Sequence, residues 1–460
     1  MSVAAASSTV PIGGRARRDI LSGALVALVL WIWLAVWWAG FAPAVMTFDS
    51  VDEWNQTISG QYRNEHPFMH SMTIALMRKM WDSPASMALL QTGLLALAVG
   101  LSVRVLLRGA RRRRGLIVYA LAFFCFPVFG IYSVTIWKDV LFSIGFFLFA
   151  IVWVDRPLLN YFIGINWKRA IATGIGIAYF ASLRHNGVVI AALIPVIVLL
   201  RRDLGRRNRA ALACSVAVTY AVVQLILPQI LHVSSKRVPF LRELTVLQLV
   251  AAVVVNNGVI TPDERITINV VSPVNQLAAH YNCYISTSAV MSLPNLAEDV
   301  FDDPAFIEQF NTAASHILIR NIPIVVADRA CMTMHMLGFG QPRWSYLYET
   351  GISPNTVGLS LNPVWPLRRT LLAFLAWSEE YPQRLLFWNY APFLIMLIVA
   401  WRNAGSGPIR DIALLVLTTA AAMCLFGPAR DHRYMFPVVL IAPFLFTYCL
   451  ALKTTKEDLK

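Results

Sequence analysis

The sequence predicts an all-α polytopic membrane protein with about ten transmembrane helices. Of its 460 residues, 57% are hydrophobic and 14% are charged, whereas about 25% of residues are charged in soluble proteins. The hydrophobic residues form runs long enough to cross a bilayer, which takes about 20 residues of helix. Basic residues separate these runs and form no single exposed patch. The net charge of +14 therefore indicates a membrane protein in contact with lipids, and we expect no nucleic acid among its partners.

The first apolar run, residues 21–41, directly follows Arg15, Arg17 and Arg18. A cleaved signal peptide also begins with basic residues, but its apolar part is only about 7 to 15 residues long. We therefore expect an uncleaved signal anchor with its N-terminus in the cytosol. Nine further candidate spans follow it: 86–107, 116–134, 140–154, 170–183, 188–200, 210–231, 385–401, 412–426 and 435–452.

The distribution of basic residues predicts the orientation of these spans. When the runs are threaded alternately through the membrane, most Lys and Arg residues fall on the side of the N-terminus, including the cluster at 111–114. Cytosolic loops carry such an excess. We expect a multi-pass protein of the cytoplasmic (inner) membrane with both termini in the cytosol.

One long polar stretch divides the chain into three parts. Residues 1–231 are expected to form an N-terminal transmembrane module with a first extracytoplasmic loop at 42–85. Residues 232–384 are expected to form an extracytoplasmic domain of mixed α and β structure, and residues 385–460 the last three spans. The apolar pieces 244–255 and 317–327 are shorter than a span and belong to the domain core or to the membrane surface. Cys283 and Cys331 both fall in this domain, where an oxidising compartment would permit a disulfide.

Ionisable residues gather in four clusters, and the threading places all four on the extracytoplasmic face. An ionisable group near the bilayer centre costs about 2.5–3.5 kcal/mol on insertion scales, so residues of this kind usually have a partner or a function. The clusters contain Asp49, Asp52 and His66 in the first loop, Lys138 and Asp139, Arg184, His185 and Asn186, and Arg430, Arg433 and Tyr434.

These clusters combine carboxylates with cations. Transfer of a group from a phosphate-linked donor needs a base near the acceptor hydroxyl and positive charge near the departing phosphate. Each cluster also has a structural interpretation: Asp49 as a helix cap, Lys138 and Asp139 as an ion pair, Arg184 to Gly187 as a polar turn, and Arg430 to Tyr434 as an interfacial anchor. Their common face favours a shared site.

Four motifs carry a family resemblance: FDSVDEWNQTISGQYRNEHP at 48–67, TIWKDVLF at 135–142, LRHNG at 183–187 and RDHRYMFP at 430–437. They resemble the polyprenyl-phosphate-sugar-dependent membrane glycosyltransferases of the GT-C superfamily, and most closely a group of bacterial members. The resemblance covers the first half and the last span, and leaves most of 232–384 unmatched. Many members carry paired acidic residues where this chain has Asp49 and Ser50, so a metal role and the choice between Asp49 and Asp52 stay open.

The resemblance implies a GT-C-like fold and transfer of a sugar from a polyprenyl-phosphate donor to a lipid, glycan or protein acceptor, in cell-envelope glycan or glycolipid assembly. Asp49 is then the base, and a single base predicts inversion at the sugar. In that family the first-loop aspartate acts as base or helps to bind a divalent metal, so the candidates for holding a Mg or Mn ion, if one takes part, are Asp49 and Asp52. The implied phosphate ligands are Lys138, Arg184, Arg430 and Arg433, and the implied sugar or acceptor contacts are Asp52, His66, Asp139, His185, Asn186 and Tyr434.

Other functions are also compatible with a polytopic protein of this kind. In a lipid or polysaccharide transporter or flippase, intramembrane charges mark the transport path, but such folds often contain paired repeats, and none is visible here. A sensor or scaffold would use 232–384 as a ligand domain and would not need Asp49. The aromatic residues Trp344, Tyr346 and Tyr348 in that segment are either an acceptor platform or part of a domain core.

Overall fold

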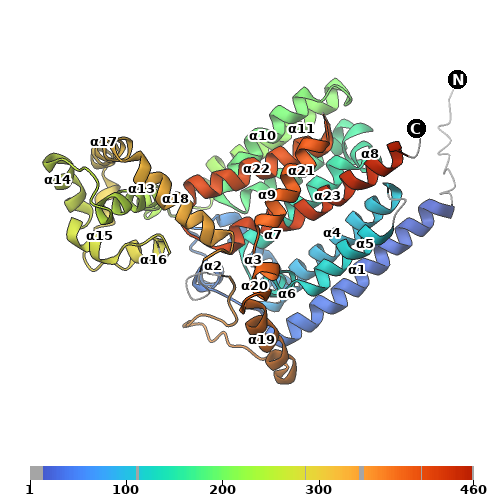
Figure 1. Cartoon of the computed structure of the whole chain (residues 1–460), viewed down its shortest axis with the longest axis horizontal. Coiled ribbons are helices and arrows are strands. Elements are labelled where there is room, and N and C mark those ends of the chain that lie inside the picture. Colours follow the sequence, from blue (N-terminus) through green and yellow to red (C-terminus); the bar gives the residue numbers. More distant parts are fainter. Residues whose placement is uncertain (1–13, 110–112, 285, 341–346, 406, 458–460) are drawn as a thin grey trace.

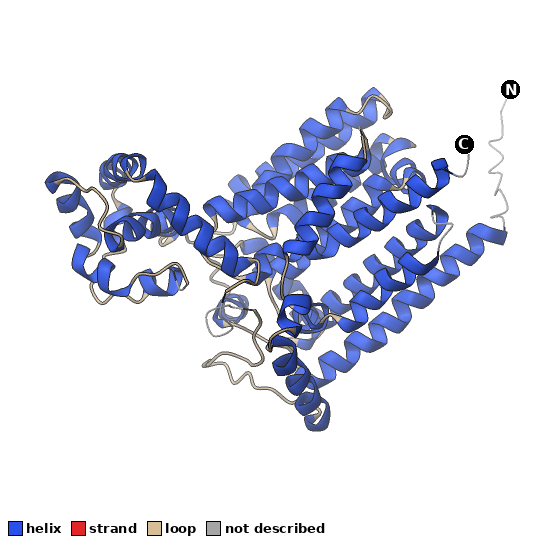
Figure 2. Cartoon of the chain, in the orientation of Figure 1, coloured by secondary structure: helices blue, strands red, loops and turns tan. Residues whose placement is uncertain are grey.

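The computed structural model describes residues 14–109, 113–284, 286–340, 347–405 and 407–457 (Figure 1). These ranges contain helices and no strand (Figure 2). Among them, seven helices are long and apolar enough to cross a membrane, or up to nine when two bent pairs each count as one span. The polytopic membrane architecture agrees with the composition, but the count of ten spans is not confirmed. Two predicted spans correspond to α9 (Trp167–Ser182) and α10 (Val188–Leu200), which have 16 and 13 residues and are short for a bilayer.

The first helix packs closely along the fourth. α1 (Gly14–Phe41) and α4 (Ala85–Gly109) cross where Gly23 faces Gly100. A Cβ atom on Gly100 would lie 2.5 Å from the carbonyl oxygen of Gly23. Small residues allow this close approach of two membrane helices. Between the two helices along the chain, α2 (Phe48–Ser59) and α3 (Phe68–Met80) lie at the end of the bundle where α1 ends (Figure 1).

Two of the predicted spans are bent. α5 (Arg113–Cys125) meets α6 (Pro127–Val134) at 50°, and Pro127 occupies the first turn of α6. α7 (Lys138–Val154) meets the following segment at 100°, where Asp155 caps the short helix α8 (Arg156–Leu159). Proline accounts for such breaks because it lacks the backbone N–H that a continuing helix needs.

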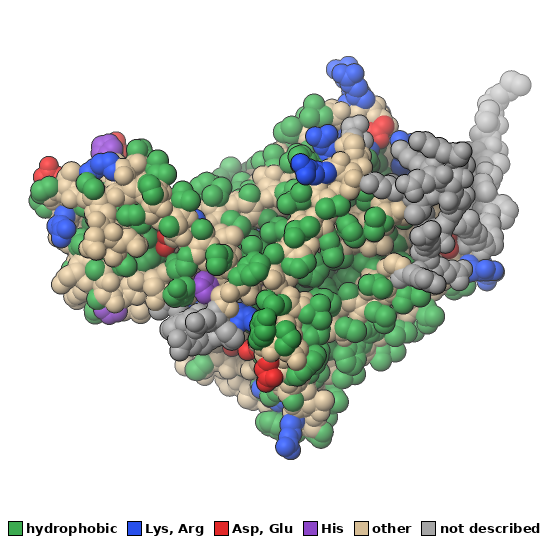
Figure 3. Space-filling model, in the orientation of Figure 1, with side chains coloured by type: hydrophobic (Ala, Val, Ile, Leu, Met, Phe, Trp, Pro, Cys, Tyr) green, Lys and Arg blue, Asp and Glu red, His purple; other side chains and the backbone are tan. Residues whose placement is uncertain are grey.

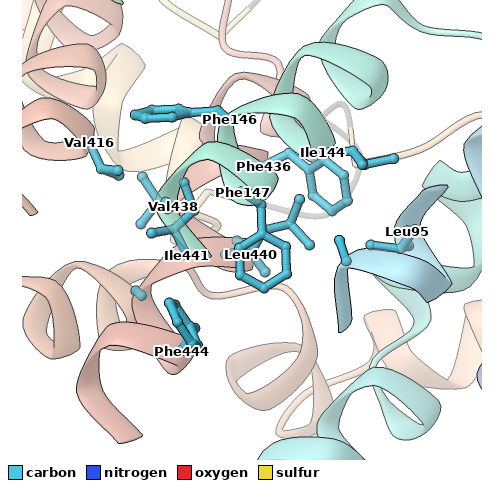
Figure 4. Close-up of a cluster of buried hydrophobic side chains, with 14 of the residues drawn as sticks. Leu95, Ile144, Phe146, Phe147, Val416, Phe436, Val438, Leu440, Ile441 and Phe444 are labelled. Carbon is cyan, nitrogen blue, oxygen red and sulfur yellow. The ribbon is translucent and has the colours of Figure 1, made fainter. Parts of the chain in front are cut away.

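The core of the bundle fixes α7 against the last helix, α23 (Phe436–Glu457). Figure 4 shows Ile144 and Phe147 packed with Leu440 and Phe444. The rings of Phe147 and Phe444 meet edge to face with their centroids 5.8 Å apart, which is a favourable aromatic arrangement. The ends of these two helices therefore stay close to each other. The remaining helices of the bundle are α11 (Arg206–Ala221), α12 (Leu227–Ile230), α20 (Gln383–Phe387), α21 (Ala391–Asn403) and α22 (Pro408–Phe426).

Six helices form a separate lobe beside the bundle, which we call the accessory lobe (Figure 1). It has its own apolar core, in which Leu247 and Phe310 are fully buried. The predicted mixed structure is wrong for this lobe, because its described residues form helices only. Short apolar stretches between turns suit short packed helices as well as strands. Its helices are α13 (Val238–Val255), α14 (Pro262–Val271), α15 (Val274–His280), α16 (Ser286–Met291), α17 (Pro304–Arg320) and α18 (Ile322–Met336).

Two further features concern the predicted segment 232–384. Cys283 and Cys331 form a disulfide within the lobe. After the lobe, the chain returns to the bundle, where the amide of Val364 donates to the carbonyl of Ala39 at 2.8 Å and α19 (Trp365–Glu379) packs on α1. Tyr348 stacks on Trp388 at 5.2 Å between centroids and so belongs to the bundle core. Trp344 and Tyr346 lie outside the described residues.

The two ends of the bundle are named by the residues that mark them on α1. α1 begins and α23 ends at the same end, which we call the Gly14 end (Figure 1). Arg108 pairs there with Asp155 at 2.9 Å, and Arg201 with Asp411 at 3.2 Å. Figure 3 shows hydrophobic side chains along the bundle and several Lys and Arg side chains toward this end. The opposite end, where α1 finishes and α7 starts, is called the Phe41 end.

Candidate functional site

A short stretch of extended backbone joins the starts of α2 and α7 at the Phe41 end. The amide of Val45 donates to the carbonyl of Val134, and the amide of Ile136 donates to the carbonyl of Val45, both at 2.9 Å. The Ser50 hydroxyl also donates to the carbonyl of Ile136. Asp49 and Lys138 each lie in the first turn of the helix that follows, so the pairing brings their side chains together.

The Asp49 carboxylate has three positively charged or polar neighbours. Its Oδ2 lies 3.4 Å from Nζ of Lys138 and 3.3 Å from Nη2 of Arg433, and its Oδ1 lies 3.8 Å from Nε2 of His66. Burial alone would raise the pKa of Asp49, but Lys138 and Arg433 outweigh burial and hold that pKa well below its usual range. The side chain keeps 29% of its surface exposed. Asp49 is therefore an ionised group that a ligand can reach.

His66 connects Lys138 with Asp49. The ammonium group of Lys138 donates to Nδ1 of His66 at 3.1 Å, so the proton of the neutral ring lies on Nε2, which faces Asp49. Burial lowers the pKa of His66, and the charge of Lys138 lowers it further. His66 is therefore neutral at neutral pH, with its Nε2 facing Asp49 at 3.8 Å.

The guanidinium of Arg433 forms ion pairs with three carboxylates. Besides Asp49, its guanidinium contacts Asp431 at 3.0 Å and Asp139 at 3.5 Å. Asp139 has no exposed surface and also pairs with Nη1 of Arg184 at 2.8 Å. These residues come from four distant segments of the chain. We call them the charge network: Asp49, His66, Lys138, Asp139, Arg184, Asp431 and Arg433.

Aromatic rings hold the two arginines of the network in place. The guanidinium of Arg433 lies 4.9 Å from the ring centroid of Trp137, and that of Arg184 lies 4.5 Å from the ring centroid of Tyr434. A guanidinium this close to an aromatic face is attracted by the ring. Tyr434 therefore packs against the guanidinium of Arg184 and helps to fix its position.

The network is balanced in charge. Three carboxylates, on Asp49, Asp139 and Asp431, face the three cations Lys138, Arg184 and Arg433. Burial raises the pKa of Asp431, and the neighbouring Asp49 and Asp139 raise it further, although Arg433 opposes them. An anionic ligand would add negative charge, and Asp431 is the group best placed to take up a proton in response. The predicted site residues did not include Asp431, although it lies between two arginines in the motif RDHR.

Among the described residues, four predicted site residues form no ion pair with this network. Asp52 pairs with Arg63 and accepts from Nε2 of Gln56 at 2.8 Å. Asn186 donates to Sδ of Met423 at 2.9 Å. His185 lies in the turn next to Arg184, where burial and the charge of Lys138 lower its pKa to about 4. Among the described residues, Nε of Arg430 is buried without a hydrogen-bond partner.

The predicted divalent cation does not fit these residues. Mg²⁺ and Mn²⁺ need several oxygen ligands around one point. Within the described ranges, no group of three or more His, Cys, Asp or Glu residues could hold a metal ion. The carboxylate of Asp49 faces Lys138 and Arg433, and that of Asp52 faces Arg63. Positive side chains occupy the positions around Asp49 that a metal would need.

A buried hydrogen bond between Glu53 and His70 joins α2 to α3 behind Asp49. Nδ1 of His70 is 2.9 Å from Oε2 of Glu53, and both side chains are almost fully buried. Burial would raise the pKa of Glu53, but His70 outweighs it and lowers that pKa. Breaking one side of such a pair is costly because it leaves a buried charge. The pair joins α2 to α3 and so supports the first turn of α2, which carries Asp49. The sequence prediction did not include it.

An apolar groove of about 480 Å³ adjoins the charge network. It starts at Phe142, which lies one turn after Lys138 on α7 and beneath the guanidinium of Arg184 at 6.0 Å. Gly176 and Phe180 of α9 line its middle, and Arg169 lies among its lining residues toward the Gly14 end. The groove therefore runs along α7 from the charged site into the region of the apolar helices.

No family model, curated protein or solved structure matches the chain. The charge network, the groove beside it and the four motifs that supply the charged residues are the features of the chain that bear on its function.

Proposed function

We propose that this protein is an integral membrane glycosyltransferase that moves a sugar from a polyprenyl-phosphate donor to an acceptor hydroxyl at the outer face of the cytoplasmic membrane. The observation that supports this most strongly is the position of the charge network at the head of an apolar groove. A phosphate at Lys138 and Arg433 would leave its isoprenoid chain free to lie along α7 in contact with Phe142 and Phe180. A polyprenyl-phosphate donor therefore suits the site, because its phosphate suits the two cations and its lipid chain suits the apolar groove.

Donor binding changes the partners of Asp49. The phosphate takes the ammonium group of Lys138 and the guanidinium of Arg433, which hold Asp49 in the free protein. Because these two cations are what lowers the pKa of Asp49, their engagement by phosphate makes the carboxylate a stronger base. A base works best when its pKa approaches the working pH. Uptake of a proton by Asp431 compensates part of the added charge.

The transfer is a single displacement. The acceptor oxygen attacks the anomeric carbon of the sugar and gives its proton to Asp49. The bond between the anomeric carbon and the phosphate oxygen breaks, and its electron pair leaves with the polyprenyl phosphate, whose charge Lys138 and Arg433 stabilise. One attack on the face opposite the phosphate inverts the anomeric centre. His66 lies with Nε2 3.8 Å from Oδ1 of Asp49 and accepts from Lys138 through Nδ1, so it helps to place the ammonium group beside the carboxylate.

A lipid transporter is the second candidate, because the groove extends from the network toward Arg169 near the Gly14 end. A transporter releases the lipid-linked sugar unchanged, whereas a transferase releases polyprenyl phosphate. Thin-layer analysis of the lipid after incubation with membranes that contain the protein separates the two functions directly.

Filling the groove tests the donor class. Gly176 lines the groove, and a Cβ atom added there meets no atom within 4 Å. We expect Gly176→Phe to weaken binding of undecaprenyl phosphate by about tenfold or more, since each buried methylene contributes about 0.8 kcal/mol. Farnesyl phosphate, whose chain is much shorter, should lose less. Both affinities are measurable by isothermal titration of the purified protein in lipid nanodiscs.

Gly115→Phe is the matched control, because Gly115 is exposed and also has no neighbour within 4 Å, but lies on α5 outside the groove. It should bind both lipids like the wild type. Equal affinities of the Gly176→Phe variant and the wild type for undecaprenyl phosphate would refute the assignment of the groove to the lipid chain.

A further inference from the structure

The segment between α22 and Asp431 is held by the accessory lobe at three successive carbonyl groups. The hydroxyl of Thr245 on α13 donates to the carbonyl of Phe426 at 3.3 Å, and Nη1 of Arg329 on α18 donates to the carbonyl of Gly427 at 3.1 Å. The hydroxyl of Thr287 on α16 donates to the carbonyl of Pro428. We call residues 426–430 the strap, and Thr245, Thr287 and Arg329 the clamp.

The strap leads directly into the charge network. Asp431 follows it, and Arg433 lies in the short helical turn His432–Met435 that comes next. Arg433 contacts Asp49, Asp139 and Asp431, so a shift of the strap would move the guanidinium relative to all three carboxylates. A displacement of about 1 Å at a catalytic group can cost 100-fold in rate.

The clamp is itself rigidly supported within the lobe. Arg329 is buried and pairs with Asp328 at 2.8 Å, and Asp328 accepts from the hydroxyl of Tyr281 at 2.8 Å. Buried networks whose members are satisfied in this way hold one geometry. Arg329 therefore presents its remaining N–H group to the strap from a fixed position.

The disulfide joins two arms of this clamp. Cys283 comes shortly before α16, which carries Thr287, and Cys331 follows Arg329 by two residues on α18. The bond therefore links the segments that contact Gly427 and Pro428. Without it, the two segments would be held together by noncovalent packing alone.

We propose that the accessory lobe positions Arg433 for catalysis through the clamp. Thr245, Thr287 and Arg329 are positioning residues, and the bond between Cys283 and Cys331 keeps their donor groups aligned with the strap. The effect on catalysis rests on the proposed function, whereas the hold on the strap does not depend on any activity of the protein.

The hold on the strap is measured with a probe placed in it. In protein carrying Ala429→Cys, the rate of modification by a membrane-impermeant maleimide at residue 429 is followed by mass spectrometry. Thr287→Val should raise this rate roughly fivefold, which corresponds to the loss of one net hydrogen bond. Thr287→Ser keeps the hydroxyl and should restore the original rate. Reduction of the disulfide, followed by removal of the reductant, should also raise the rate.

Thr312→Val is the matched control, because Thr312 lies on α17 of the same lobe and its hydroxyl donates only within that helix, to the carbonyl of Glu308. Its labelling rate should equal that of the parent protein. An unchanged rate in Thr287→Val and after reduction would overturn the clamp, whatever the activity of the protein.

The catalytic part is tested by kinetics without the cysteine probe. Thr287→Val should lower kcat by roughly fivefold while KM for the donor changes less, because Arg433 acts mainly on the departing phosphate. Thr287→Ser should recover kcat. Faster labelling with unchanged kcat would overturn the positioning role. Faster labelling with no sugar transfer in any variant, the wild type included, would refute the proposed function and leave the structural clamp established.

Discussion

Asp49→Asn is expected to reduce sugar transfer by about 10²- to 10⁴-fold, which is the range that a general base contributes. The amide has the size and shape of the carboxylate but cannot accept the proton of the acceptor hydroxyl. Asp49 is the carboxylate with 29% of its side chain exposed, whereas Asp139 is completely buried. No other carboxylate of the network is as open to an acceptor. The measurement is the rate of polyprenyl phosphate release by purified protein, supported by the masses of surface glycans in a host that lacks the gene.

The control for this variant is Asp82→Asn. Asp82 lies in the same loop region, exposes 67% of its side chain and pairs with Arg78, which lies in the last turn of α3. It should retain the wild-type rate. With both variants at wild-type abundance, a normal rate in Asp49→Asn would remove Asp49 from the mechanism and, with it, the most exposed carboxylate of the network.

Asp139→Asn is expected to destabilise the protein by about 3–5 kcal/mol, which is the usual cost of removing one partner of a buried ion pair. Asp139 has no exposed surface, and it neutralises Arg184 at 2.8 Å and Arg433 at 3.5 Å. Without the carboxylate, both guanidinium groups keep their charge in a buried site. The measurement is the thermal unfolding temperature of the protein in detergent, recorded through tryptophan fluorescence.

A double variant identifies the cause of that loss. Asp139→Asn combined with Arg184→Gln removes both members of the pair. The double variant should therefore lose about 1 kcal/mol or more less stability than the sum of the losses in the two single variants. Additive losses would show that Asp139 and Arg184 do not stabilise each other. A wild-type unfolding temperature in Asp139→Asn alone would contradict the buried position of Asp139.

The sequence was informative about features that repeat along the chain. Apolar runs of sufficient length predict membrane helices because the bilayer requires them, and the alternation of the runs predicts which clusters share an end. The structure places Asp49, Lys138, Arg184 and Arg433 within one network, although they lie up to 384 residues apart. Their positions at helix ends could be predicted because a charged residue next to an apolar run is excluded from the apolar part of the membrane.

The sequence was uninformative about side-chain direction within short segments. Arg430 and Arg433 are separated by two residues, but only Arg433 reaches Asp49, because the helical turn at 432–435 determines which side chain faces the network. Asp52 lies one helical turn from Asp49 but pairs with Arg63, a residue of the following loop. Such choices depend on backbone geometry that has no repeating pattern.

The accessory lobe was the least predictable region. Its helices are short, and α13 has the length and composition of a membrane span while its buried residues belong to the core of the lobe. Apolar composition does not distinguish these two environments. The clamp was equally hidden, because its acceptors are backbone carbonyls, which any residue carries. Thr245, Thr287 and Arg329 acquire their role only when the lobe is folded against the strap.

A structure with a donor analogue that cannot transfer its sugar tests the account most directly. Bound to a phosphonate analogue of a polyprenyl-phosphate sugar in lipid nanodiscs, the protein should hold the phosphonate within about 4 Å of Lys138 and Arg433, the distance of an ion pair. The sugar should face Asp49, and the lipid chain should follow α7 past Gly176. A phosphonate at the Gly14 end, beside Arg108 or Arg201, or a lipid chain outside the groove would contradict the account.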